Sequence, residues 1–571
     1  MIPARRLAPN VQEALRSYEQ SRLELQRNVR LSWWSHWAAL AELFSPRRYR
    51  WFVTPQQWNR GSPMNQSIVD ETGLLAARTL ATGLLSGLTS PTKPWFRLGI
   101  HGARDMPPGA EKEWLATCTE RMLEVYAGSN LYTALGTAYR DNAVFGSAAL
   151  IQYEDPETVV YFLAPALGEF MFGLDARLRV SELRREFAYT VQECVDQWGL
   201  ENLSPATQML YKTGQRDMEV VICHAIEPND VIYSSGEAIG WCVPKHFKYR
   251  EVHWEQVSAS GTSGRGFVIG CSGFHEKPFV GLRWDVTSND PYGSSPGMDA
   301  LPAVRQLQVE QRRKAEGIDK QVRPPMIASV SMRNEPTDIT AGGVTYCADV
   351  QNSGFKPAFT VTPQVQELKE DILVVQQRVK DIFFNDLFRM ISDLQTVRSA
   401  TEIDARLQEK LVLLGPVIER TETEGLDQII MRTFAIMQRR GLFPPMPASL
   451  QGKTINIEYI SMLAEAQRAA STAAIERLVQ FTAGLVAVQP DAMDNLNTDA
   501  IIDKYGDLLN VDPALMHAAN DVAAIRQARA AQQQQAAALQ TGMAAAQGAQ
   551  TLSKTDVGGG KNALQAMMEA A

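Results

Sequence analysis

Hydrophobic residues recur at helical spacing through residues 11–44. Trp33 and Trp37 lie one helical turn apart in this stretch. The pattern predicts one long helix that ends at Ser45 and Pro46 and packs its Trp residues in a core or an interface. The same spacing predicts further helices at 68–85 and 111–126.

The pattern changes between residues 148 and 284, where short runs of β-branched and aromatic residues alternate with Gly and Pro. Such runs are typical of strands separated by turns. They occur at 149–153, 158–163, 219–224 and 267–270. A helix is expected at 181–199. An antiparallel sheet with helices beside it makes this part of the chain α+β.

Two helices around a compact insert are predicted in the second half. The first covers 299–320, and a Pro- and Gly-rich stretch follows to residue 361. Thr362 and Pro363 then mark a second helix, with Thr as the N-cap and Pro in the first turn. This helix carries a heptad seam, as helices packed side by side require. The seam consists of Val365, Leu368, Ile372, Val375, Val379 and Ile382.

A long kinked helix is predicted next. Ser399 and Glu402 form a capping box at its start, and Gly441 ends it. Pro416 lies inside the helix and removes a backbone hydrogen bond, which predicts a kink. More helices are expected in 461–531. The Ala-, Gln- and Gly-rich end of the chain is either a mobile tail or a helix that needs neighbours.

The composition is that of a soluble globular protein with several domains. The chain has 571 residues, of which 45% are hydrophobic and 21% charged. Six scattered cysteines without a CxxC pair indicate reduced thiols, as in a protein made in the cytoplasm. The N-terminus lacks an apolar signal segment and no apolar run is long enough to span a bilayer, so no membrane partner is expected.

The acidic charge balance limits how the protein could meet nucleic acid. The formal net charge is −8, whereas tight DNA binding depends on basic residues that neutralise phosphates. The charge argues against a surface that grips DNA. It is compatible with a smooth conduit along which DNA slides.

One motif could indicate a hydrolase. Residues 293–297 match the G-x-S-x-G nucleophile elbow around Ser295. The oxyanion hole of that motif uses the N–H of the next residue, which here is Pro296 and has none. His517 is the only histidine further along the chain. A Gly/Ser/Pro turn is the simpler interpretation.

Two other motifs are weaker still. Cys242 with His246 and Cys271 with His275 imitate a zinc site without its usual spacing. Residues 261–266 are Gly-rich but lack the Gly-Lys-Ser/Thr ending of a phosphate-binding loop. We therefore predict no catalytic residue, no metal and no cofactor.

Basic residues gather around the turn that follows the first of the two helices. Any one of them is most simply a solvated side chain. Together, in an acidic protein, they predict a region that faces anions or a partner. They are Arg312, Arg313, Lys314, Lys320, Arg323 and Arg333.

A series of short motifs is more specific in its order than in any single member. The series runs Asp70-Glu-Thr-Gly, 81–91, 94–98, Asn142 with Phe145-Gly146, Asp290-Pro-Tyr-Gly293 with Pro296-Gly297, Ala400-Thr-Glu402 with Arg406, Leu414-Gly-Pro-Val417 with Arg420 and Glu424, and Arg440-Gly441 with Pro444-Pro445. In this order the chain resembles the portal, or head-to-tail connector, proteins of short-tailed bacteriophages. The motifs span about residues 10–445, and none is shared after Gln451.

The resemblance implies a mostly helical α+β portal fold in a closed ring of twelve subunits at one capsid vertex. Double-stranded DNA would be packaged and ejected through the ring, which joins head to tail. The implied partners are the terminase, tail adaptor proteins, and the major capsid and scaffold proteins. The protein would be made in the cytoplasm of the host bacterium and reside in the virion. Twelve chains of −8 would carry about −96, which favours a channel that repels phosphates.

The portal layout assigns a part to each segment of the chain. The parts are a wing at 1–297 (helical to 147, strand-rich from 148), a first stem helix at 298–322, a clip at 323–361, a second stem helix at 362–390, a tunnel loop at 391–398, a long kinked helix with the rest of the wing at 399–460, a helical crown at 461–531 and a tail or barrel at 532–571.

The same layout implies the site residues. Arg323 and Arg333 would lie in the clip, where the terminase and then tail adaptors dock, and the heptad seam would form the stem interface. The tunnel loop, closest to passing DNA, would comprise Ile391, Ser392, Asp393, Gln395, Thr396 and Arg398. Its hydroxyl and amide groups could bond phosphates while its carboxylate limits the grip. The arginine would approach the DNA backbone or pair with a neighbouring carboxylate.

Two other functions remain as alternatives. One is a hydrolase at the Ser295 turn, against which Pro296 and the missing histidines count. The other is a different capsid structural protein or a scaffold protein. Images of the purified protein that show rings, or none, separate the second alternative from a portal.

Overall fold

The computed structural model describes residues 2–3, 6–53, 61, 63–100, 110–234, 236–256, 266–323, 325–328, 330, 333, 356–357, 365–388, 413–460, 475–484, 496–508 and 519–554. The chain divides into two compact units. The first contains Met1–Trp95, Met122–Leu442 and Ser461–Gln467, and the second contains Phe96–Arg121, Phe443–Ile460 and Arg468–Ala571.

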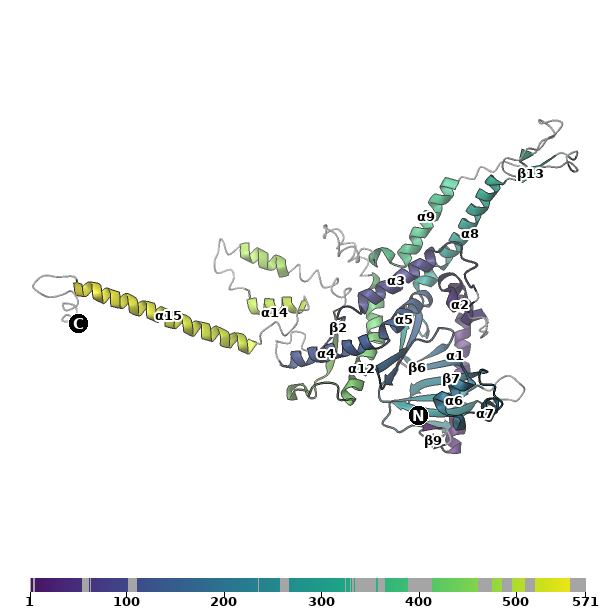
Figure 1. The fold of residues 1–571 in the computed structure, drawn as a ribbon, viewed down its shortest axis with the longest axis horizontal. Helices are drawn as coiled ribbons and strands as arrows, with labels where there is room; N and C mark the ends of the chain where they lie inside the picture. Colours follow the sequence, from purple (N-terminus) through teal and green to yellow (C-terminus); the bar gives the residue numbers. More distant parts are fainter. Residues whose placement is uncertain are drawn as a thin grey trace, which may run out of the picture. The chain divides into compact units, whose positions relative to one another are not determined.

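A six-stranded antiparallel sheet forms the centre of the first unit (Figure 1). Its strands follow the order β1-β11-β10-β7-β6-β5, so neighbours in space are often distant in sequence. The strands are β1 (Ile2–Pro3), β5 (Phe170–Leu174), β6 (Val180–Thr190), β7 (Glu219–Pro228), β10 (Tyr249–Glu255) and β11 (Phe267–Phe274).

Both faces of this sheet are covered. Helix α1 (Pro9–Phe44) packs Leu15 and Leu23 on one face, in a core with Cys223 of β7. Because side chains alternate along a strand, the adjacent Ile222 points to the other face. There it packs with Trp198 of α6 (Val191–Trp198).

The helix expected at 181–199 is wrong over its first half. Residues Val180–Thr190 form β6, and only Val191–Trp198 is helical. The helix begins at a capping box, in which Thr190 and Glu193 bond each other's backbone N–H groups. The strand was missed because it carries charged residues where a half-buried strand normally carries hydrophobic ones.

A second, three-stranded sheet has the order β12-β3-β4, with β12 (Phe279–Arg283), β3 (Ser147–Asp155) and β4 (Val159–Leu163). Its central strand follows directly on α5 (Leu131–Phe145). The unit also contains α2 (Pro46–Val53), α3 (Thr72–Leu88), η3 (Leu200–Asn202), α7 (Pro205–Lys212), β8 (Ile232–Ser234) and β9 (Glu237–Gly240).

The Trp cluster of α1 lies in the core of the first unit. Trp37 is fully buried. Its ring centroid is 6.0 Å from that of Trp33 and 4.8 Å from that of Tyr292. The predicted packing of these residues in a core is therefore confirmed.

Two long antiparallel helices lead away from the sheets side by side, with β13 at their far end (Figure 1). They are α8 (Pro296–Val322) and α9 (Val365–Ile382), and the strands beyond them are β13 (Met326–Ile327) and β14 (Lys356–Pro357). Within the predicted second helix at 362–390, α9 ends at Ile382, Phe384 has a left-handed φ of 53°, and residues 385–388 are helical again. Residues 362–364 lie outside the described chain.

The long helix is described from residue 413 onward. Pro416 lies in the described helical residues 413–420. A π-helical segment, η5 (Thr421–Leu426), follows them and leads into α12 (Asp427–Arg439). The predicted capping box at Ser399 lies outside the described residues. The irregular turn comes after the proline, in a segment that packs against β12.

The second unit contains a two-stranded sheet of β2 (Phe96–Ile100) and β15 (Ile455–Tyr459). Its helical elements are α4 (Ala110–Gly128, which begins in this unit), η6 (Ala448–Leu450), α14 (Thr498–Leu508) and α15 (Ala519–Lys554). Helix α15 is continuous through residue 532, where the predicted crown ends and the predicted tail begins. None of the helices in the described residues has the length and apolarity that crossing a membrane requires.

Candidate functional site

The predicted stem seam lies on α9. Ile372, Val375 and Val379 are buried, and Leu368 and Ile382 are half-buried. Val365 is the first residue of the helix. Helix α9 packs against α8 and α3 of the same chain. The seam therefore has its partner within one subunit.

Five apolar side chains on the same two helices are exposed, and we call them the exposed apolar set. They are Val309, Ile318 and Val322 on α8 and Leu373 and Val374 on α9, each between 40% and 72% exposed. The last buried residue of α8 is Gln308, so the outer half of this helix contributes nothing to the core of its own chain. Apolar side chains left open on a projecting helix pair are typical of a contact with another protein.

Asp70 ties the base of the two helices to the body. Its Oδ1 accepts a hydrogen bond from the N–H of Thr72 at 2.9 Å, at the start of α3. Its Oδ2 accepts from Nε2 of Gln311 on α8 at 3.1 Å and of Gln376 on α9 at 2.7 Å. Burial alone would raise the pKa of Asp70, but these hydrogen bonds lower it below its ordinary value.

Gln308 completes this junction. Its Oε1 accepts from the N–H groups of Val69 and Asp70 at 2.7 and 2.9 Å, and its Nε2 donates to the carbonyl of Asp70 at 2.9 Å. Sequence reasoning found no partner for Asp70. The available signal was the spacing of Gln308 and Gln311, which places two amides one turn apart on a helix.

The structure describes only part of the predicted clip and none of the predicted tunnel loop. Arg323 is exposed and ends α8, with its N–H bonded to the carbonyl of Asp319 at 2.7 Å. Arg333 is exposed. The tunnel-loop residues, which lie outside the described chain, are Ile391, Ser392, Asp393, Gln395, Thr396 and Arg398.

Ser295 is a helix cap. Its hydroxyl donates to the carbonyl of Val144 at 2.7 Å and accepts from the N–H of Met298 at 3.1 Å, in the first turn of α8. The residue is 2% exposed. A buried hydroxyl with both bonds engaged cannot attack a substrate, so the hydrolase alternative fails here. His517 lies outside the described residues.

The two Cys–His motifs do not form one metal site. Cys242 and Cys271 are buried in the core between α1 and the sheet. His246 is exposed and His275 is half-buried, with ring centroids 5.6 Å apart. Among the described residues, the group close enough to suggest a metal is a different one, formed by His224, Glu251 and His253.

This His–Glu–His group lies on the neighbouring strands β7 and β10. The rings of His224 and His253 are stacked with centroids 4.3 Å apart and planes within 3°. A metal must lie in the plane of each imidazole that binds it, and two separate parallel planes share no such point. Instead, Oε1 of Glu251 contacts Nε2 of His224 at 2.8 Å and accepts from the hydroxyl of Tyr153 at 3.2 Å.

The group is expected to make folding sensitive to acid. Burial lowers the pKa of His253 to about 3 and also lowers that of His224. A histidine with a depressed folded pKa stabilises the fold above its unfolded pKa of about 6.5, and this stability is lost as the pH falls. Each such histidine contributes up to about 1.4 kcal/mol per pH unit in that range.

Urea unfolding between pH 7 and 5 tests this expectation. His253→Phe keeps the stack and removes one titrating group, so the stability should fall less steeply with acid than in the unmodified protein. His246→Phe on the exposed loop is the control and should leave the slope unchanged. Equal slopes in all three proteins would contradict the assignment.

A buried ion-pair network joins α1 to the sheet. Arg184 on β6 is fully buried; its Nη2 lies 3.0 Å from Glu19 of α1 and also pairs with Glu227 of β7. Arg250 on β10 pairs with Glu227 as well. Burial and the charge of Glu227 raise the pKa of Glu19. Burial would do the same to Glu227, but the two arginines lower its pKa below the ordinary value.

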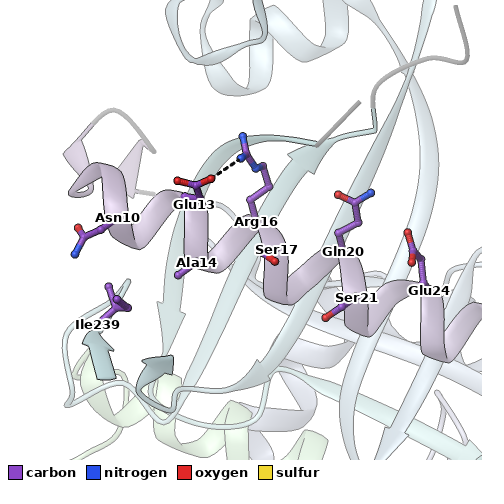
Figure 2. A pocket seen from close by; sticks show the side chains of 9 residues that line it. All are labelled: Asn10, Glu13, Ala14, Arg16, Ser17, Gln20, Ser21, Glu24 and Ile239. Carbon is purple, nitrogen blue, oxygen red and sulfur yellow. Dashed lines mark hydrogen bonds and ion pairs between the residues drawn. The ribbon is translucent and has the colours of Figure 1, made fainter. Parts of the chain in front are cut away.

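A polar groove runs along the exposed side of α1 beside Ile239 of β9 (Figure 2). It has a volume of about 500 Å3. Figure 2 shows Glu13 and Arg16 paired, at 3.5 Å, with Gln20 and Glu24 further along the same helix. The groove has no grouping of nucleophile and base among these side chains, and its mixed charges are typical of a contact surface.

Comparison with known proteins agrees with these features. Residues 18–516 match the family described as "Bacteriophage head to tail connecting protein". The portal protein of Salmonella phage epsilon15 is 38% identical over 532 residues, which cover 93% of this chain and 94% of that protein. The probable portal protein of Bordetella phage BPP-1 is 37% identical over 530 residues, 92% and 93% of the two chains.

Two solved structures of gene transfer agent particles are also similar. The first is a virion of the native particle, with a TM-score of 0.34 and 10% identity; the match covers 72% of this chain and 85% of that chain. The second is the neck of an empty particle, with a TM-score of 0.35 and 12% identity; the match covers 71% of this chain and 86% of that chain. TM-scores this low do not define a shared fold. The family match, by contrast, extends over most of the sequence, and two relatives share more than a third of their residues with it. The chain therefore belongs to the bacteriophage head to tail connecting protein family.

Proposed function

We propose that twelve copies of this chain form a closed ring at one capsid vertex, through which double-stranded DNA enters and leaves the head. The exposed apolar set on α8 and α9 carries this proposal. The seam on α9 packs within the subunit, whereas the exposed set, which includes Val322 and Val374, is accessible to a neighbouring copy. A repeated contact between two different faces closes into a ring when its rotation allows.

The overall acidity supports a channel that passes DNA without holding it. Each chain has a formal charge of −8, so phosphates in the lumen of a ring meet net repulsion. The ring acts in the virion after synthesis in the host cytoplasm. Its other partners are the major capsid and scaffold proteins, the terminase during packaging, and tail adaptors afterwards.

The clip at 323–361 is the docking region for terminase and tail adaptors. Helices α8 and α9 have β13 of this segment at their shared end (Figure 1), where β13 pairs with β14, and Arg323 is exposed. Arg323→Glu with Arg333→Glu should weaken binding of both partners at least ten-fold, because basic side chains at the rim of an interface steer an acidic surface. If a pull-down showed both partners binding the variant as before, the clip assignment would be wrong.

The tunnel loop at 391–398 is the part of the ring nearest to DNA. It follows the described helical residues 385–388 and precedes the long helix. A loop held between rigid elements can reach into a channel without unfolding them. Shortening it should leave ring assembly intact and reduce the retained genome length. Failure of the shortened protein to form rings would make the segment an assembly element instead.

Helix α15 belongs to a barrel of neighbouring copies. Its described side chains are exposed almost throughout, and Leu539 and Met543 lie on one face one turn apart. In proteins, most of a helix's stability comes from packing an apolar face against neighbours. Packing against the same helix of adjacent subunits would bury the apolar side chains that α15 leaves exposed.

A further inference from the structure

A cavity of about 360 Å3 lies where the π-helical segment meets the two sheets of the first unit. Arg179, the residue before β6, and Lys277, in the turn between β11 and β12, line it. The π-helical segment contributes Thr423 and Glu424, and Gln428 follows on α12. The lining is polar, and none of these side chains takes part in the stem, the clip or the tunnel loop.

Lys277 is the unbalanced charge of this cavity. It is half-buried, and its ammonium donates to the carbonyl of Val180 at 2.5 Å and lies 4.7 Å from the ring of Phe279. Among the described residues, the Lys277 ammonium forms no ion pair with a carboxylate. Burial lowers its pKa to about 8, because Glu424 and Asp175 offset that effect only in part.

The other charges around the cavity are already paired. Arg179 makes two hydrogen bonds to Asp175, at 3.0 and 2.9 Å. Arg283 makes two to Glu424, at 3.1 and 2.7 Å. Three cations and two carboxylates leave one positive charge, and it belongs to Lys277.

One further donor lacks a partner among the described residues. It is Nη1 of Arg283, which is buried, and the same guanidinium bonds Glu424 in the wall of the cavity. Buried donors are nearly always hydrogen-bonded, so an unpaired one beside the cavity indicates that an acceptor occupies it. The adjoining turn is π-helical, a geometry that is rare and is often found at functional sites.

We propose that this cavity binds a small free oxyanion of the phosphate class, held by the Lys277 ammonium, and that the bound anion fastens the π-helical segment of the long helix to β12. An oxyanion supplies the charge that Lys277 lacks and acceptors for an unpaired guanidinium nitrogen. Asp175 and Glu424 repel an extended polyanion, which favours a single free anion over the backbone of duplex DNA.

The test is a titration of the full-length protein with inorganic phosphate, at constant ionic strength maintained with chloride and at pH 7. The thermal midpoint should rise saturably, and calorimetry should give one site per subunit. In Lys277→Met the apparent affinity should fall at least ten-fold. Lys277→Arg, which keeps the charge, should retain most of the binding. Lys212→Met, at an exposed position on α7, is the matched control and should behave as the unmodified protein.

Removal of the ammonium also has a consequence in buffer free of phosphate. There Lys277→Met should unfold no earlier than the unmodified protein, because an unbalanced charge has been replaced by an apolar side chain of similar length. Absence of a saturable phosphate effect in the unmodified protein, or an equal effect in Lys277→Met, would overturn the proposal. So would a shift that depends on Lys277 and appears with duplex DNA of equal phosphate content but not with free phosphate.

Discussion

Arg184→Met is expected to lower the stability of the first unit by about 3–5 kcal/mol, the range for breaking a buried ion pair by removing one partner. Arg184 is fully buried and pairs with Glu19 and Glu227. Without it, two carboxylates remain in the interior, with Arg250 as the nearest cation. Urea unfolding followed by far-UV circular dichroism measures the loss.

Arg22→Met is the matched control. Arg22 pairs with Glu182, which Arg184 also contacts at 2.6 Å, so Glu182 keeps a cation when Arg22 is removed. The Arg22 side chain is also 34% exposed. Water compensates an exposed pair, so the control should lose at most about 1 kcal/mol. Adding Glu19→Gln to Arg184→Met should restore part of the loss, because one buried carboxylate is then removed while Glu227 keeps Arg250 as its partner. Equal losses for Arg184→Met and Arg22→Met would contradict the role of burial.

Gly146→Ala is expected to destabilise the first unit by about 3 kcal/mol or more. Gly146 has a φ of 78°, which L-residues rarely adopt. A Cβ there would also lie 2.1 Å from the carbonyl oxygen of Gly293. That neighbour is backbone and cannot swing aside, so β3 and the turn before α8 would have to move apart.

Gly136→Ala on the same helix, α5, is its control. A Cβ at that position meets only a side-chain methyl of Leu85, at 3.6 Å, which is an ordinary contact. An alanine in a helix interior is favoured over glycine by about 1 kcal/mol, so this variant should be neutral or slightly more stable. Thermal unfolding of both variants compares them directly. A stable Gly146→Ala protein would mean that the backbones do not approach so closely.

The glycine contact explains part of the family resemblance. Phe145-Gly146 and the segment from Asp290 to Gly297 are far apart in sequence, yet Gly146, Gly293 and Gly297 mediate backbone contacts between α5, β3 and α8. These motifs could be read from the sequence, but their partner could not. The family match confirms the resemblance, and with it a structural connector rather than an enzyme.

Helices were easier to predict than the charged strand. The spacing of hydrophobic residues located α1, α8 and α9 because each buries one continuous stripe. Strand β6 was missed because Arg184 and Arg185 face inward, where their charge is balanced by Glu19 and Glu169 from other elements. No local pattern shows that a charged residue will find a buried partner on another element, such as Glu19, which lies 165 positions before Arg184.

The candidate site was also predicted only in part. The heptad seam was found on α9, but its partner proved to be α8 of the same chain, so the seam by itself is no argument for a ring. The argument for a ring comes from the exposed apolar set on α8 and α9. It includes Leu373 and Val374, which lie next to seam residues in the sequence. Asp70 was missed because its partners are amides, which carry no charge pattern.

Native mass spectrometry of the full-length protein tests the central claim most directly. The account predicts one dominant species with twelve times the mass of a single chain, which persists on dilution because each subunit contacts two neighbours. Moderate salt should leave this species intact, because salt screens charges and the exposed set on α8 and α9 is apolar. Only monomers or dimers across a range of protein concentrations and salt would contradict the ring.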